Sequence, residues 1–232
     1  MSGAVQRIFS GIEDTYEGIN HLLTFGLDIL WRRRAVRLAV RAGGRRWLDV
    51  CAGTGETACY LKRRAGPDVG VTAVDFSAPM LRTAARKPAA AGIHFTLADT
   101  GRLPFADGTF DLVTLSFATR NLKTGSQALP TVFAEIIRAL RPGGRFVNLE
   151  TSQPRRRLLR TLSRAYVGLV VRPVGRWISG SDAAYAYLSS TIPRFHGAEE
   201  LAAILGAAGF EKVEYRSLLG GVAAIHIARK TC

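Results

Sequence analysis

The feature that most constrains the fold of this chain is an alternation of short apolar runs with helical patterns through its middle part. The apolar runs occupy residues 46–50, 69–75, 93–97, 110–116 and 145–150. Several of them, such as 112–115, do not alternate apolar and polar residues as a half-exposed strand would. Strands buried on both faces have this composition, which is typical of a parallel sheet covered by helices. The sequence therefore predicts a doubly wound α/β fold.

Helical periodicity marks segments between these strands. One apolar set has the spacing i, i+3, i+4, i+7 and consists of Phe133, Ile136, Ile137 and Leu140. We expect the Pro-Gly-Gly sequence at 142–144 to end this helix. A second amphipathic set spans 201–208 and is followed by Gly209, which is expected to stop it.

The C-terminal part departs from the alternation. Two strand-like runs, 212–218 and 222–229, are separated only by Leu219–Gly221. A link this short cannot make a parallel crossover, so the two runs are expected to be antiparallel neighbours. A mostly parallel, seven-stranded, Rossmann-like sheet that ends in one antiparallel hairpin is the sheet of class I S-adenosylmethionine-dependent methyltransferases.

Two segments lie outside the predicted sheet of what we expect to be a single domain spanning 1–232. Residues 1–40 are predicted to form an N-terminal helical cap, and 152–196 a helical insertion that belongs to a substrate cap. One helical face of the insertion is apolar: Leu158, Leu159, Leu162, Tyr166, Leu169 and Val170. Arginines at 155–157, 160 and 164 surround its first turns. Such a basic amphipathic helix can lie on a membrane or pack as a cap, and the sequence leaves both open.

The turn after the first strand is a candidate ligand loop. Residues 48–55 read Leu-Asp-Val-Cys-Ala-Gly-Thr-Gly, and a helix is expected to begin near Glu56. Glycine is needed where the backbone takes a positive φ or where a ligand touches it closely. Asp75 ends the next strand, where a carboxylate can accept hydrogen bonds from ribose hydroxyls. Taken alone, these features suit NAD, S-adenosylmethionine or a simple tight turn.

Three features favour S-adenosylmethionine over NAD, and so a methyltransferase over a dehydrogenase. The loop lacks the third glycine of the pyrophosphate fingerprint. The acidic Asp49 and Glu56 suit a cationic ligand better than a pyrophosphate. Asp99 follows the third strand, where it could accept a hydrogen bond from an adenine amino group. The carboxyl ends of the strands are where such sheets bind ligands.

Composition limits the cellular location and the partners that can be expected, and says little about the reaction. The 232 residues include three cysteines, whose odd number and spacing match neither a disulfide framework nor a zinc site, so we expect free thiols and no metal. We find neither a signal peptide in the first residues nor an apolar run that could span a membrane, so a cytoplasmic location is expected. The net charge of +14 fits nucleic acid, an anionic membrane or simply solvated arginines.

Motifs of one known enzyme family run along nearly the whole chain. They comprise 9–12 with Tyr16, Asn20, 25–26 and 31–32; 74–77 with 80–81; 103–105 with 110–111; 116–122; 140–145; 149–154; Ser179, Gly180, Tyr185, Tyr187, Leu188, Ile192 and Phe195; and 220–226. On these residues the chain resembles the ubiquinone/menaquinone biosynthesis C-methyltransferases. It departs from the family pattern on the substrate side, at Glu17, Ile19, Thr24, Asp28 and 118–119.

The resemblance implies methylation of a ring carbon on a polyprenylated quinol, with S-adenosylmethionine as the methyl donor. The stretches 149–154 and 220–226 look more like the demethylmenaquinone members, and methylation of a benzoquinol in ubiquinone biosynthesis is the alternative. A nucleic-acid methyltransferase would carry a base-flipping motif that 116–122 lacks. A non-catalytic cofactor-binding module and a homodimer remain compatible with the sequence. A lipid substrate also implies peripheral association with the anionic inner face of the membrane.

The resemblance also implies roles for individual residues. The cofactor would be held by Asp49, Gly53, Thr54, Gly55, Asp75, Asp99, Thr100 and Ser116. Arg120 and Asn121 would face the transferring methyl group, with Arg120 as the stabiliser of a phenolate and Tyr16 as its partner. The alternatives are a loop-shaping role for 120–121 and core packing for Tyr16. His226 is expected to be structural.

Overall fold

The computed structural model describes residues 13–122, 128–179 and 182–231, and within them seven strands form one sheet in the order β3-β2-β1-β4-β5-β7-β6. The strands are β1 (Arg46–Val50), β2 (Gly70–Asp75), β3 (Ile93–Leu97), β4 (Phe110–Ser116), β5 (Leu140–Thr151), β6 (Phe210–Leu218) and β7 (Ala223–Lys230). β1 to β5 are parallel, and β7 is antiparallel to both β5 and β6. The predicted mostly parallel sheet with a C-terminal antiparallel hairpin is therefore confirmed.

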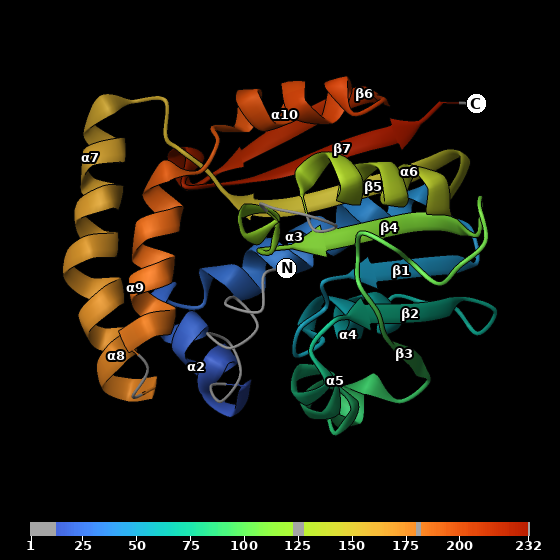
Figure 1. Ribbon diagram of the computed structural model, residues 1–232, viewed down its shortest axis with the longest axis horizontal. Coiled ribbons are helices and arrows are strands. Elements are labelled where there is room, and N and C mark those ends of the chain that lie inside the picture. Colours follow the sequence, from blue (N-terminus) through green and yellow to red (C-terminus); the bar gives the residue numbers. More distant parts are fainter. Residues whose placement is uncertain (1–12, 123–127, 180–181, 232) are drawn as a thin grey trace.

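Helices cover both faces of this sheet (Figure 1). The longer helices are α2 (Glu13–Leu23), α3 (Leu27–Ala39), α4 (Glu56–Lys62), α5 (Ala78–Ala85), α6 (Leu129–Ala139), α7 (Arg157–Tyr166), α8 (Arg172–Ser179), α9 (Asp182–Thr191) and α10 (Ala198–Ala207). α3 and α4 pack against one face, and α6 and α10 against the other. None of the helices in the described ranges combines the length and apolarity that crossing a bilayer would require.

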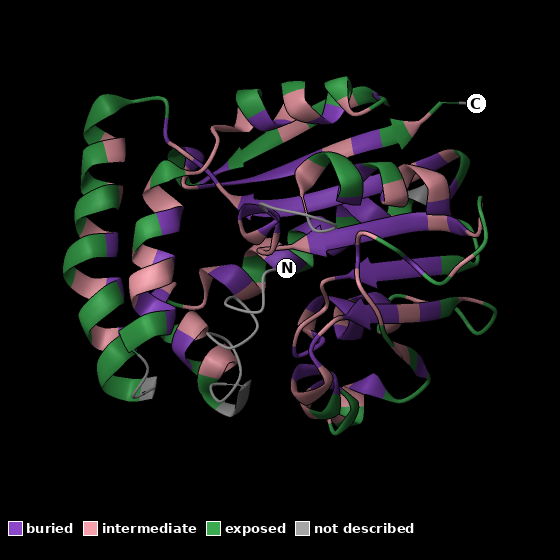
Figure 2. Cartoon of the chain, in the orientation of Figure 1, coloured by how far each residue is buried: buried purple, intermediate pink, exposed green. Residues whose placement is uncertain are grey.

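The apolar runs of the sequence form the buried centre of the molecule, as Figure 2 shows for the strands. Successive residues of β1 face opposite sides: Trp47 belongs to the core under α3 and α4, and Leu48 to the core under α6 and α10. Leu112 and Val113 of β4 alternate in the same way. Burial of both faces explains why these strands show no polar alternation.

The boundary between α6 and β5 differs from the sequence-based expectation. The helix ends at Ala139, and β5 begins directly at Leu140, before the Pro-Gly-Gly sequence that was expected to stop the helix. Leu140 is fully buried and pairs with Phe110 of β4, ahead of a bulge in the ladder. Burial of Leu140 in the sheet core thus outweighs its favourable position in the helical pattern.

The predicted N-terminal and 152–196 segments pack against each other at the carboxyl ends of the strands, on the left of Figure 1. Ile19 and Leu23 of α2 share a small core with Tyr185 and Leu188 of α9. α7 continues through the π-helix Val167–Val171 into α8. The family motif at 9–12 lies outside the described residues.

Candidate active site

The turn after β1 carries the loop that the sequence singled out. Its backbone enters the left-handed region at three residues, with φ of 53° at Cys51, 56° at Gly53 and 78° at Gly55. Glycine adopts this region without strain, but Cys51 does so against its own side chain, a kind of strain that clusters at functional sites. Gly55 is also the N-cap of α4. The loop thus turns sharply from strand to helix at the carboxyl edge of the sheet.

A first cavity lies along this loop, at the edge where open α/β sheets bind their ligands. Its lining residues are Tyr16, Arg32, Cys51, Ala52, Gly53, Thr54, Glu56, Asp75, Phe76, Ser77, Met80, Ser116, Phe117, Ala118, Asn121 and Leu122. The list contains four of the predicted cofactor residues, Gly53, Thr54, Asp75 and Ser116. It also contains Asn121 and Tyr16 from the predicted catalytic set.

Asp75 ties the loop to the end of β2. Its Oδ2 accepts a hydrogen bond from the Gly53 amide at 2.8 Å, and its Oδ1 accepts one from the Ser77 amide at 2.8 Å. Burial raises the pKa of Asp75, and these backbone donors oppose the rise. Its carboxylate therefore orders the loop from within and borders the cavity at the same time.

The other predicted cofactor residues, Asp49, Gly55, Asp99 and Thr100, are absent from the residues that line the cavity. The Thr100 hydroxyl is buried and contacts Cys51 Sγ at 3.3 Å, so it supports the loop. Asp99 Oδ1 accepts the Gly101 amide at 2.7 Å, which shapes the turn after β3. Gly55 packs against Ala84 of α5. The prediction that these residues touch the ligand thus has no direct support from the lining.

Asp49 lies buried in β1 under the loop. Its Oδ1 accepts a hydrogen bond from the Thr114 hydroxyl of β4 at 2.7 Å. Burial raises the pKa of Asp49 to about 7, although the Thr114 hydrogen bond and the charge of Arg32 lower it. A cation that binds nearby would lower the pKa of this carboxyl group and so favour its ionised form.

We expect Asp49→Asn to remove a pH dependence of folding stability. Between about pH 4 and about pH 7 the folded protein retains a proton on Asp49 that the unfolded chain releases, so the free energy of unfolding falls as the pH rises through this window. The loss amounts to about 4 kcal/mol for a shift of about three pKa units. Urea unfolding of the wild type at about pH 5 and about pH 8 spans about two of these units and should show a loss of about 3 kcal/mol, which the Asn variant should lack. An Asn variant with the wild-type slope would contradict the assignment.

A second, larger cavity of about 500 Å³ lies between the N-terminal helices and the helices of the 152–196 segment. Its walls are mostly apolar and include Leu23, Phe25, Leu27, Trp31, Leu159, Leu162, Tyr166, Val167, Val171, Leu188, Ile192, Leu219 and Val222. Pockets of this size bury a drug-sized ligand. The sequence did not predict its wall, because it forms only when the two caps meet.

The two cavities adjoin at three residues that line both: Tyr16, Arg32 and Phe117. Phe117 follows β4 with a φ of 56°, a strained value for a phenylalanine. The Arg32 guanidinium lies over the Phe117 ring, 4.8 Å from its centroid, within the range of a cation–π contact. A ligand in one cavity would therefore meet a ligand in the other across these side chains.

Arg120 and Asn121 form the 3-10 turn Thr119–Asn121 after β4, and they face different cavities. Asn121 lines the first cavity and Arg120 the second. The Arg120 Nη1 donates to Glu150 Oε1 at 2.6 Å and to the Phe117 carbonyl at 3.1 Å. Burial lowers the pKa of Arg120, but the Glu150 carboxylate outweighs it and keeps the pKa above its ordinary value. Arg120 is thus a permanent, buried cation on the wall of the apolar cavity.

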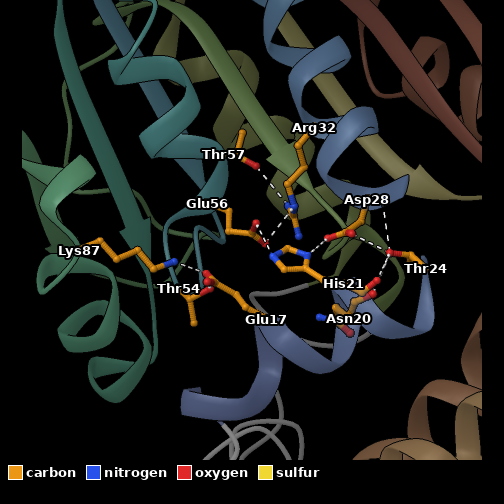
Figure 3. Close-up of polar contacts among 10 residues, drawn as sticks. All are labelled: Glu17, Asn20, His21, Thr24, Asp28, Arg32, Thr54, Glu56, Thr57 and Lys87. Atoms are coloured by element: carbon orange, nitrogen blue, oxygen red, sulfur yellow. Dashed lines mark hydrogen bonds and ion pairs between the residues drawn. The ribbon is translucent and has the colours of Figure 1, made fainter. Parts of the chain in front are cut away.

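A chain of polar contacts connects α2 to the loop of residues 51–55, here called the cofactor loop (Figure 3). The Thr54 hydroxyl donates to Glu17 of α2, and Glu17 also forms an ion pair with Lys87. Glu17 is one of the residues at which this chain departs from the family pattern. Its position shows that the N-terminal cap closes over the first cavity through a side chain that reaches Thr54.

A second group of contacts in Figure 3 links α2 and α3 to α4. His21 lies between two carboxylates, with Nδ1 2.9 Å from Asp28 Oδ2 and Nε2 3.4 Å from Glu56 Oε1. Arg32 Nε is 3.3 Å from Glu56 Oε2, and its Nη1 donates to Thr57 at 3.2 Å. These contacts fix Arg32 at the boundary between the cavities.

Glu17, His21 and Glu56 lie close enough together to share a metal ion. Each already has a charged partner: Glu17 pairs with Lys87, Glu56 with Arg32, and His21 with Asp28. Two of these partners, Lys87 and Arg32, already supply the positive charge that a metal ion would bring to Glu17 and Glu56. The group therefore has the character of an ion-pair network.

Sequence reasoning missed three residues of the site: Arg32, Phe117 and Glu150. Each stood inside a stretch quoted for the family resemblance, yet only the packing of the caps gives it a partner. His226 lines neither described cavity, and its Nε2 contacts the Ala198 carbonyl at 2.8 Å, as a structural histidine would.

The first cavity has a volume of about 90 Å³, which holds part of S-adenosylmethionine, and the chemistry of its lining suits that ligand. The Asn121 Oδ1 is buried and lacks a hydrogen-bond partner among the described residues, so it is an acceptor that a ligand donor can satisfy. Asp75 and Glu56 bring carboxylates to the lining, and a cationic ligand suits them. The Gly53 side of the loop presents backbone without a Cβ to the cavity.

The sheet order, the antiparallel hairpin and this cavity together define a class I S-adenosylmethionine-dependent methyltransferase. The same fold occurs in the crystal structure of a SAM-dependent methyltransferase from Thermotoga maritima, with a TM-score of 0.68, 18% identity, and coverage of 97% of this chain and 100% of the other. The chain belongs to the ubiE/COQ5 methyltransferase family, whose model matches residues 1–230.

Two relatives illustrate the similarity. The "Demethylmenaquinone methyltransferase" of Thermus thermophilus is 44% identical over 222 residues, which cover 95% of this chain and 98% of the relative. The "Ubiquinone/menaquinone biosynthesis C-methyltransferase UbiE" of Desulfotalea psychrophila is 38% identical over 222 residues, covering 96% of this chain and 88% of the relative.

Proposed function

We propose that this enzyme methylates a ring carbon of a polyprenylated quinol, and that demethylmenaquinol is the substrate. The observation that carries the proposal is the apolar cavity of about 500 Å³ that adjoins the cofactor cavity and holds two buried cations in its wall, Arg120 and, at the boundary with the cofactor cavity, Arg32. A quinol ring with an apolar tail matches such a cavity, because it offers one oxygen that can become anionic and otherwise apolar surface. The names of the relatives support the same substrate class.

The residues that would hold the cofactor are those of the first cavity, chiefly Gly53, Thr54, Asp75, Ser116 and Asn121. S-adenosylmethionine supplies a methyl group made electrophilic by its sulfonium. The loop of 51–55, and Glu17 of α2, which accepts the Thr54 hydroxyl, would hold the cofactor in the cavity that adjoins the second one. Aligning donor and acceptor is the main task of the protein in such a transfer.

Arg120 acts on the quinol side. The ring carbon becomes nucleophilic when an adjacent hydroxyl gives its proton to water, and the developing phenolate needs a fixed positive charge. After the methyl group is transferred, the ring carbon releases its own hydrogen to water as a proton, which restores the aromatic ring. Arg120 stays protonated, so it stabilises the anion rather than accepting the proton. Glu150 orients the Arg120 guanidinium. The Nε of Arg120 is buried and has no hydrogen-bond partner in the described part of the chain. That donor is therefore available to a substrate oxygen.

Tyr16, Arg32 and Phe117 would surround the point where the two ligands meet in this proposal. Their side chains exclude water from the point where the methyl group crosses, which protects the phenolate from solvation. Tyr16 comes from α2, so the N-terminal cap has to be closed for this wall to be complete.

The substrate assignment is tested by incubating the protein with methyl-labelled S-adenosylmethionine and short-tailed forms of both demethylated quinols. We expect label in the naphthoquinol product and at least about tenfold less in the benzoquinol product, a ratio that corresponds to about 1.4 kcal/mol in the barrier. Preference for the benzoquinol would move the assignment to ubiquinone biosynthesis. Transfer to neither would contradict the proposed function.

A peripheral position at the inner face of the membrane belongs to this proposal. The substrate's tail keeps it in a bilayer, and the chain carries a net charge of +14, which anionic lipids attract. Electrostatic attraction of this kind is worth about 1 kcal/mol for each basic residue near the surface.

A further inference from the structure

The second cavity opens to the outside through an apolar rim. Three of its lining residues are themselves largely exposed: Phe25 at 79%, Leu162 at 57% and Leu219 at 60%. They come from three separate segments, namely the turn after α2, helix α7 and the turn between β6 and β7. Large apolar side chains that are both exposed and part of a cavity wall mark the point where the cavity meets its surroundings.

α7 extends this rim along one face. Leu158, Leu162 and Leu169 lie four and seven residues apart, which places them on the same side of the helix. Leu158 and Leu169 are exposed and line neither described cavity. α7 is the outermost element on its side of the molecule, and α8 continues it with Trp177, which is 86% exposed (Figures 1 and 2).

The N-terminal helices continue the rim on the other side of Phe25. Leu22 of α2 and Leu30 of α3 are both more than half exposed. Together with the rim and the α7 and α8 side chains, they are the large apolar residues that the two caps and the β6–β7 turn expose, here called the mouth face: Leu22, Phe25, Leu30, Leu158, Leu162, Leu169, Trp177 and Leu219. Scattered exposed leucines are ordinary, but a set gathered around the opening of a cavity indicates an interaction site.

Arginines predominate among the charges of the caps, although Arg155 pairs with Glu199, and Arg172 and Arg176 lie within 4 Å of Asp182. Arg33, Arg34 and Arg37 follow Leu30 at i+3, i+4 and i+7, so they share its side of α3, and all three are exposed. Residues 152–179 contain arginines at 155–157, 160, 164, 172 and 176, and no acidic residue. Apolar side chains flanked by arginines match the surface of a bilayer that contains anionic lipids.

The size of the cavity adds a reason for contact with a bilayer. About 500 Å³ holds a ring and the first part of a prenyl tail, because pockets of this size bury ligands of drug size. The remainder of a long tail has to leave through the apolar rim. Exposure of that tail to water would cost free energy in proportion to its apolar area, whereas acyl chains receive it without loss.

We propose that the mouth face docks on an anionic bilayer, with the rim of Phe25, Leu162 and Leu219 against the acyl chains, so that the quinol ring enters the cavity from the membrane while its tail stays there. The proposal rests on the proposed function for the identity of the tail. It goes further in assigning α7 to membrane contact, a question that the sequence left open. The contact is interfacial: the apolar side chains enter the outer part of the bilayer and the arginines meet the head groups.

Sedimentation with vesicles tests the docking face. The full chain and a Leu158→Glu/Leu169→Glu variant are mixed with vesicles of phosphatidylcholine and phosphatidylglycerol, and with vesicles of phosphatidylcholine alone. We expect binding of the wild type to the anionic vesicles that weakens with salt, and a loss of about tenfold for each substituted leucine. Leu97→Glu is the matched control, since Leu97 is an equally exposed leucine at the end of β3, and we expect it to bind as the wild type does.

Trp177 provides an independent readout. It is exposed, whereas Trp47 is buried and Trp31 is partly buried, so its fluorescence should shift to shorter wavelength when anionic vesicles are added. The Trp177→Phe variant should lose that shift. A shift that persists in Trp177→Phe would show that the signal comes from elsewhere and count against the docking face.

Methylation of a water-soluble quinol distinguishes a failure of the docking face from a failure of the proposed function. Leu158 and Leu169 line neither cavity, so the double variant should methylate a water-soluble, short-tailed quinol at a rate within about twofold of the wild type. If the wild type itself fails to methylate that quinol, the proposed function is wrong, while sedimentation still decides the docking face. Equal vesicle binding by the wild type and the double variant would overturn the docking proposal. So would a dimer that becomes a monomer in the double variant without loss of vesicle binding, which would assign the face to a second copy of this chain.

Discussion

Replacement of Arg120 by alanine is expected to lower kcat by about a hundredfold to a thousandfold while cofactor binding persists. The magnitude is that of removing one fixed electrostatic stabiliser from a water-excluded site. Arg120 lines the second cavity and is absent from the lining of the first, so the affinity for S-adenosylmethionine should change little. Single-turnover methylation of the quinol and equilibrium binding of the cofactor measure the two quantities separately.

The alanine variant has a structural consequence that the experiment must account for. Glu150 is fully buried and pairs with Arg120 at 2.6 Å, so removal of the arginine leaves a buried carboxylate without its cation. Breaking a buried pair in this way costs about 3–5 kcal/mol of stability. The alanine variant alone could therefore lose activity by unfolding.

A double variant resolves this ambiguity. Arg120→Met/Glu150→Gln replaces both charges, and the glutamine keeps an oxygen that can accept the Thr151 amide, which Glu150 now accepts at 2.8 Å. We expect thermal unfolding near that of the wild type, because replacing both members of a buried pair is often neutral. Activity should remain as low as in the alanine variant. A stable double variant with wild-type turnover would show that Arg120 only shapes the loop.

The strands and the ligand loop could be predicted because they depend on local patterns. β1, β3 and β4 match the expected ranges residue for residue. For β1 and β4 the reason is burial on both faces, which leaves an unambiguous apolar run. The start of β5 could not be predicted, because Leu140 fits the helical period as well as the strand and only its partner Phe110 in β4 decides between them.

The sequence pointed to those residues of the candidate site that lie at strand ends, and it did not point to those that reach the site through the packing of the caps. Asp75 ends β2 and Asn121 follows β4, and both line the cofactor cavity. Asp49 and Thr100 occupy equally suggestive positions, yet both are buried behind the loop, because the direction of a side chain at a strand end depends on the turn that follows. Arg32 lies 19 residues before Cys51, where the loop of 51–55 begins, and only the packing of α3 against α4 brings it to the cavity.

The two glycines of the cofactor loop can be used to test where the ligand touches the loop. Both have a positive φ, but only Gly53 has room for a side chain. A Cβ on Gly55 would lie 2.8 Å from the Ala84 Cβ of α5, an atom fixed to the backbone of a fully buried residue. A Cβ on Gly53 would meet no atom of the described residues within 4 Å. The position of Gly53 in the cavity lining explains this space, which a bound ligand would occupy.

We therefore expect Gly55→Ala and Gly53→Ala to fail in different ways. Gly55→Ala combines backbone strain of about 1–2 kcal/mol with overpacking of about 1–3 kcal/mol, so urea unfolding should show a loss of roughly 2–5 kcal/mol. Gly53→Ala bears the strain alone, and its stability should fall by only about 1–2 kcal/mol. Its cofactor affinity should fall at least tenfold, because the added methyl group enters the space where the ligand touches the backbone. A Gly53→Ala protein that binds S-adenosylmethionine as the wild type does would show that the ligand does not approach this part of the loop, and the cofactor would then have to be held from the Asp75 and Asn121 side of the cavity.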